Sequence, residues 1–129
     1  MTAETLWATP VQGGYKVDNI PFYVRGVAVG DIVEVFPTVG GGLQFAKVVV
    51  PSRHSTLRIV LTDSDDVPVL RRILLEKGCE TELSHIPTLI AVDVPPSVDL
   101  SAIESFLEPG VESGKWEFEE GCIGEIEPS

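Results

Sequence analysis

The chain has 129 residues, 43% of them hydrophobic, which is enough for one ordinary domain or two very small units that share a core. Its formal net charge is −11, and residues 99–129 contain nine carboxylates against one lysine. A negative field of this size repels nucleic-acid phosphates and anionic membrane surfaces, and it attracts basic proteins or metal ions. We therefore expect no nucleic-acid partner, and we expect any protein partner to be basic.

The sequence also indicates where the protein acts. No apolar run approaches the ~18–20 residues that a transmembrane helix requires. The first ten residues, MTAETLWATP, contain neither a positively charged region nor the apolar stretch of an export signal. These features predict a cytoplasmic protein that does not span a membrane.

The first half of the chain combines β-branched residues with glycine turns. Two hairpins are predicted around these glycines, joining residues 6–10 to 15–17 and residues 32–37 to 43–50. The triple glycine at 40–42 precedes a strand and not a helix, so it predicts a turn and not a phosphate-binding loop. Residues 1–52 are therefore predicted to form a small antiparallel sheet or half-barrel.

The stretch 54–78, HSTLRIVLTDSDDVPVLRRILLEKG, predicts a strand, an acidic turn and an amphipathic helix. Alternating apolar residues give the strand one buried face, and the carboxylates of the turn suit the positive end of a helix. Pro68 falls in the first helical turn, where its missing N–H costs nothing, and Gly78 suits the position after the helix. The apolar stripe of the helix consists of Val67, Leu70, Ile73 and Leu74.

The residues after Gly78 again predict strands followed by a helix. The predicted elements are strands at 80–85 and 88–94, a helix from residue 100, and a strand at 115–119. Ser101 and Glu104 have the spacing of a capping box, and Pro109-Gly110 is expected to end the helix.

The order β-α-β-β-α-β is that of the ferredoxin-like fold. We therefore predict an α+β protein with a glycine-rich antiparallel β N-terminal half packed beside a ferredoxin-like half at 53–120. Residues 121–129 are predicted to be an acidic tail.

This topology predicts that the two cysteines stay apart. The second and fourth strands of a ferredoxin-like sheet are its two edges, roughly 14 Å apart. Cys79 precedes one of these strands and Cys122 follows the other, so we expect no disulfide between them. They form no CxxC pair either, which argues against a zinc knuckle or a redox motif.

The topology also predicts a sheet face without helices. This face would present Val60, Leu89 and Ala91, which are too apolar for a solvated surface. The N-terminal half, a second copy or a partner should cover it, and the N-terminal half is the favoured cover. No aromatic residue lies on the central strands, which argues against RNA binding of the RRM type.

Three groups of residues could carry chemistry, and we expect none of them to do so. His54 and Ser55 are adjacent in a strand and point in opposite directions, so His54 is expected to cap a backbone group. The turn with Asp63, Asp65 and Asp66 lacks the glycine and the downstream glutamate of a calcium loop. His85 has no second ligand at metal-binding spacing. We predict no cofactor and no metal.

Two resemblances add to this interpretation. The segment DVPVL at 66–70 resembles the start of ACT-type ligand-binding domains, although Val69 stands where those domains have glycine. More of the chain resembles a small acidic bacterial family of unknown function. The residues that carry this resemblance are LWA (6–8), VDNIPF (17–22), RGVAVGD (25–31), HSTLR (54–58) and WEFEEGC (116–122).

We expect a non-enzymatic protein-interaction module. Its most concrete version is an immunity or inhibitor protein that neutralises a basic toxin or nuclease domain, which the family resemblance suggests by association. The expected contact residues are Glu117, Glu119, Glu120, Glu125 and Glu127.

The alternative is an ACT-like small-molecule-binding regulatory domain. A third hypothesis is an enzyme that uses His54 with a carboxylate from the turn at 63–66. Both monomer and homodimer remain open.

Overall fold

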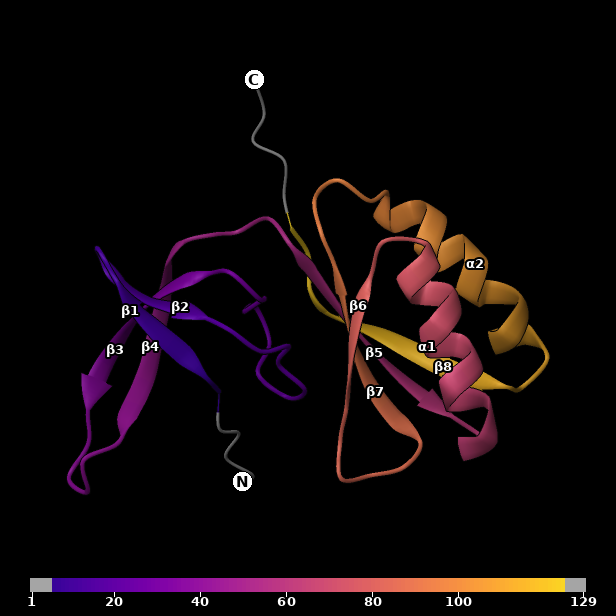
Figure 1. Cartoon of the computed structure of the whole chain (residues 1–129), viewed down its shortest axis with the longest axis horizontal. Coiled ribbons are helices and arrows are strands. Elements are labelled where there is room, and N and C mark those ends of the chain that lie inside the picture. The colour runs from indigo at the N-terminus through magenta and orange to yellow at the C-terminus, as the bar shows by residue number, and fades with distance from the viewer. Residues whose placement is uncertain (1–5, 125–129) are drawn as a thin grey trace.

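The computed structural model describes residues 6–124 and contains two antiparallel sheets and two α-helices. Figure 1 shows the sheets side by side, with both helices packed on the second sheet. The predicted α+β class is confirmed.

The first sheet contains the four N-terminal strands in chain order. They are β1 (Ala8–Val11), β2 (Gly14–Val17), β3 (Ile32–Pro37) and β4 (Leu43–Val50). Both predicted hairpins form, and Gly13 and Gly41 adopt the positive φ angles of 93° and 87° that these turns require. Three buried valines form the core of this sheet: Val17, Val27 and Val33.

The second sheet has the strand order β6-β7-β5-β8, which is that of the ferredoxin-like fold. Its strands are β5 (Ser55–Leu61), β6 (Glu80–Leu83), β7 (Leu89–Val94) and β8 (Trp116–Cys122). The helices α1 (Val67–Glu76) and α2 (Leu100–Glu112) cover one face. The core under these helices includes Leu57, Ile59, Leu70, Leu74, Ile90, Val92, Ile103 and Leu107.

The start and end of α1 follow the predicted signals. The acidic turn forms the short helix η1 (Ser64–Asp66), and Asp63 Oδ1 accepts a hydrogen bond from the N–H of Asp65 at 2.9 Å. Pro68 lies in the first turn of α1, and Gly78 has a φ of 96° directly after the last turn.

Both ends of α2 differ from the prediction. The N-cap is Asp99, whose Oδ1 accepts from the N–H of Ser101 at 3.0 Å, so the predicted capping box at Ser101 does not form. The helix continues through Pro109 to Glu112 because packing stabilises its last turn. Trp116 donates from Nε1 to the carbonyl of Leu107 at 2.9 Å.

The segment between β2 and β3, residues 18–31, covers the helix-free face of the second sheet; we call it the connector. The N–H of Ile20 donates to Glu82 Oε2 at 3.1 Å, and the N–H of Gly26 donates to the carbonyl of Gly121 at 2.9 Å. Under this cover Ala91 is completely buried. The expected intramolecular cover is therefore present over most of this face.

The last strand is longer than predicted, since β8 continues to Cys122 and includes residues assigned to the tail. Cys79 and Cys122 are both free thiols, in agreement with the absence of a disulfide between them. Burial raises the pKa of Cys79 to about 11, so this thiol is inert near neutral pH. No helix in residues 6–124 is long and apolar enough to cross a membrane.

Candidate functional site

The predicted contact residues on β8 lie on two different faces of the sheet. Glu117 and Glu119 pair with Val60 and Arg58 of β5, so they lie on the helix-free face. The regular alternation of side chains along β8 places Glu120 opposite Leu57, whose side chain is in the core under the helices. The structure therefore separates Glu120 from the other two. Glu125 and Glu127 lie outside the described residues.

The charge of Glu119 is compensated within the molecule. Its Oε1 lies 2.8 Å from Arg58 Nη2, and its Oε2 lies 3.2 Å from Arg25 Nη2. Arg58 is only 6% exposed and also donates from Nη1 to the carbonyl of Phe22. This network joins β5, β8 and the connector, so a structural role accounts for Glu119.

The helix α2 adds carboxylates that the sequence analysis did not select. Glu104, Glu108 and Glu112 follow one another at intervals of four residues, which places them along one helix face. The carboxyl group of Glu104 interacts with that of Glu120 on β8. We call these four residues the acidic ridge. The spacing of four was the signal in the sequence that could have identified it.

The carboxylates of the acidic ridge repel one another. The pKa of Glu104 is raised, first by partial burial and then by the interaction with Glu120 and the charge of Glu108. Within residues 6–124 no ion pair reaches any of these four side chains. A cation placed on the ridge would relieve this repulsion.

A groove remains open on the helix-free face where the connector ends. It has a volume of ≈ 410 Å³ and is lined by Tyr23, Arg58, Val60, Leu89, Glu117, Phe118 and Glu119. We call it the open-face groove. This volume falls in the range of about 300–1,000 Å³ typical of small-ligand pockets.

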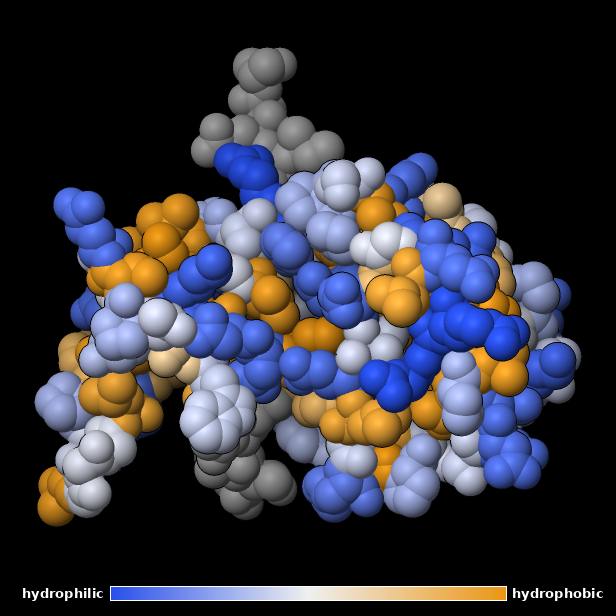
Figure 2. Space-filling view, in the orientation of Figure 1, coloured by the Kyte–Doolittle hydropathy of each residue, from blue (hydrophilic) through white to orange (hydrophobic). Residues whose placement is uncertain are grey.

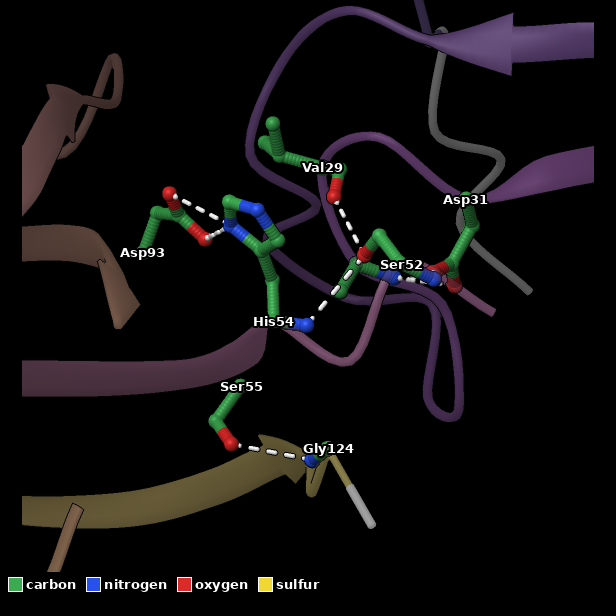
Figure 3. Close-up of polar contacts among 8 residues, drawn as sticks. Val29, Asp31, Ser52, His54, Ser55, Asp93 and Gly124 are labelled. Atoms are coloured by element: carbon green, nitrogen blue, oxygen red, sulfur yellow. Dashed lines mark hydrogen bonds and ion pairs between the residues drawn. The ribbon is translucent and has the colours of Figure 1, made fainter. Parts of the chain in front are cut away.

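His54 pairs with a carboxylate that the sequence analysis did not connect to it. Its Nδ1 lies 2.8 Å and 3.0 Å from the two carboxylate oxygens of Asp93, as Figure 3 shows. The expectation that His54 caps a backbone group is therefore wrong. The hypothesis of a pair with the turn at 63–66 is also wrong, because the seven residues of β5, about 3.3 Å each, separate the two.

The neighbouring hydroxyls are used for backbone contacts. Ser52 Oγ donates to the carbonyl of Val29 at 2.7 Å and accepts from the N–H of His54 at 3.2 Å, while Ser55 Oγ accepts from the N–H of Gly124 at 2.9 Å (Figure 3). Neither hydroxyl is hydrogen-bonded to the imidazole. The cluster therefore holds the chain where it crosses from the first sheet to the second.

Asp93 is 4% exposed, and burial raises its pKa even though His54 lowers it.

In residues 6–124 no group of three or more His, Cys, Asp or Glu side chains is arranged to hold a metal ion. His85 is exposed in the segment between β6 and β7.

The first sheet has exposed apolar residues and a second, smaller groove. Figure 2 shows apolar side chains gathered on this part of the surface. The groove has a volume of ≈ 270 Å³ and includes Trp7, Tyr15, Val35, Leu43 and Phe45 in its lining. Trp7 is 73% exposed at its rim.

Comparisons with known proteins support the fold and the family. The chain is similar to a solved structure described as "Novel crystal structure of a hypothetical protein from Neisseria gonorrhoeae", with 22% identity and a TM-score of 0.83 over 95% of this chain and 85% of that one. At this identity the likeness shows the fold alone. No curated protein matches the chain. The model of the family described as "Domain of unknown function (DUF4265)" matches residues 4–118, so the chain belongs to this family of unknown function.

Proposed function

We propose that the protein is a non-enzymatic interaction module of the cytoplasm that binds a basic protein. In its most concrete version it is an immunity or inhibitor protein that covers a basic toxin or nuclease surface. The observation that carries the proposal is the acidic ridge of Glu104, Glu108, Glu112 and Glu120, whose carboxylates lie close together without basic partners among the described residues.

Such a surface acts mainly on the rate of association. Complementary charge steers two proteins together and can raise the association rate constant by orders of magnitude at low salt. Added salt screens this attraction, because the Debye length is about 8 Å at physiological ionic strength. Among the residues predicted on β8, Glu117 and Glu120 are the stronger contributors, since Glu119 is already paired with two arginines.

The experiment starts with affinity capture of the tagged full chain from a nuclease-treated lysate of its host. Association of the captured partner is then measured against salt for the wild type and for Glu108→Lys with Glu112→Lys. We expect the double variant to associate at least tenfold more slowly and to lose most of its salt dependence. Glu76→Lys, at the exposed end of α1, is the control for charge reversal outside the ridge.

Two results would contradict the proposal. One is a capture that returns only the bait. The other is a partner whose association has the same salt dependence with and without the ridge charges.

A second candidate is an ACT-like regulatory domain that binds a small molecule. The observation that favours it is the open-face groove of ≈ 410 Å³, which lies on a ferredoxin-like sheet. This candidate predicts a dimer on sizing and a rise in melting temperature with one member of a metabolite library. A library without any stabilising compound would argue against it.

A further inference from the structure

The open-face groove exists because one residue of a central strand is left uncovered. Six of the seven residues of β5 are buried, whereas Val60 is 52% exposed. β5 is a central strand of its sheet, with β7 on one side and β8 on the other. The connector covers Arg58 through the carbonyl of Phe22, but it does not cover Val60.

The shape and lining of the groove suit a long side chain with an apolar stem. Val60 and Leu89 are paired neighbours on β5 and β7 and provide an aliphatic floor. Tyr23 adds an aromatic residue to the lining, whereas the ring of Phe118 packs against the core on the other face of the sheet. Arginine and lysine stems pack on such apolar surfaces, and their charged ends are attracted to aromatic faces.

The charges around the groove select a cation. Its lining contains Glu117, Glu119 and Arg58, of which the two carboxylates are exposed. The Nε and Nη2 atoms of Arg58 are shielded from solvent, and Glu119 lies against the guanidinium. An anion would have to displace Glu119 before it reached Arg58. Glu117 has no ion pair among residues 6–124, so its negative charge is available to a ligand.

We propose that the open-face groove receives an arginine or lysine side chain of the basic partner. The stem lies on Val60 and Leu89, and the charged end meets Glu117. This inference rests on the proposed function and gives it a specific contact: one cationic side chain enters a groove next to β8, in addition to the attraction of the acidic ridge.

The test is an NMR titration of the ¹⁵N-labelled full chain with acetyl-Gly-Arg-Gly-amide. A twin peptide with neutral citrulline in place of arginine has the same shape without the charge. We expect the arginine peptide to shift the amide signals of Val60, Leu89 and Glu117. The citrulline peptide, and the arginine peptide on Glu117→Gln, should each bind about fivefold more weakly, as expected for a single accessible ion pair. Glu76→Gln is the matched control and should bind like the wild type.

Three outcomes would overturn the inference: shifts confined to α2, shifts in the groove that Glu117→Gln leaves unchanged, or no shifts. A parallel titration with 3-phenylpropionate tests the opposite charge. Binding of this acid in the groove, without binding of the arginine peptide, would mean that Arg58 is the anchor and that the groove takes small acids.

Binding of the captured partner to the two sets of variants distinguishes a failure of this inference from a failure of the proposed function. If ridge variants slow association while Glu117→Gln leaves partner affinity unchanged, only the groove inference fails. If neither set of variants has an effect, the proposed function fails as well.

Discussion

The two sheets of this protein differ in how many of their apolar side chains are buried. In the part of the chain that the structure describes, the core of the second sheet contains twelve buried residues and that of the first contains three. The first sheet and the segments next to its strands have large apolar side chains exposed to solvent: Trp7, Val11, Phe36, Val39, Leu43, Phe45, Val49 and Val50. The net charge is also distributed unevenly. Residues 6–50 contain three acids and three bases, while the acidic excess lies toward the C-terminus.

The difference follows from the number of layers. A sheet buries its apolar faces only against another layer. The second sheet has two helices on one face and the connector on the other, whereas the helices of the molecule leave the first sheet uncovered. We therefore expect the ferredoxin-like half to provide most of the stability and the first sheet to depend on it.

Matched core substitutions give the largest expected effects. Val92→Ala in the second sheet should reduce the free energy of unfolding by about 2 kcal/mol, because its fully buried site cannot collapse around the lost methyl groups. Val33→Ala in the first sheet should cost about 1 kcal/mol, because its few neighbours can relax. Urea denaturation measures both. Equal losses would mean that the two cores are equally well packed.

Labelling of Cys79 sharpens the same comparison. This thiol is buried in the second core, so it reacts only when that core opens. In a Cys122→Ser background, Val92→Ala should speed labelling about 30-fold, the equivalent of about 2 kcal/mol. Val33→Ala should leave the rate of Cys79 labelling unchanged if the two halves, divided at residue 52 as predicted, unfold independently of each other. Equal acceleration would show a single cooperative unit.

Gly110→Ala should have the next largest effect. A Cβ atom at this position would lie 2.1 Å from Cε2 of Trp116, so the ring would have to move and its hydrogen bond to Leu107 would break. We expect a loss of roughly 1.5 kcal/mol. The loss should come with a change in Trp116 fluorescence, measured in a Trp7→Phe background. Glu112→Ala, in the same turn but exposed, is the control. An unchanged emission would contradict the packing described for this helix end.

Asp93→Asn tests the contact between Asp93 and His54 through the pH dependence of stability. The pKa of Asp93 is raised above its ordinary value of 3.8, so the folded protein binds this proton more tightly than the unfolded chain does. Its contribution to stability is present below pH 3.8 and is lost as pH rises through the raised pKa. Stability of the variant relative to wild type should therefore increase over that window. A constant difference in unfolding free energy would contradict the raised pKa.

The smallest expected effect concerns the acidic ridge. Glu120→Gln removes one of the like charges that raise the pKa of Glu104. NMR titration of the Glu104 carboxyl should show its pKa move toward the ordinary value of 4.5. The return should be partial, because burial is the largest cause and remains. An unchanged pKa would mean that Glu120 does not interact with Glu104.

The sequence by itself determined the order of the elements. Period-two alternation, glycine turns and the proline near the start of α1 are local signals, and each acts within a few residues. They were enough to predict both hairpins, the ferredoxin-like half and the edge positions of the strands next to Cys79 and Cys122. The family resemblance was also confirmed.

Only the tertiary structure decided how α2 ends and how the charged residues are paired. Trp116 lies beyond α2 in sequence but packs on Gly110, so the helix passes the proline that local rules take as its end. The partners of Glu119 come from the connector and from β5, far away along the chain. Likewise, Asp93 reaches His54 because β7 lies beside β5. Long-range pairing sets these contacts, and no local pattern of residues encodes it.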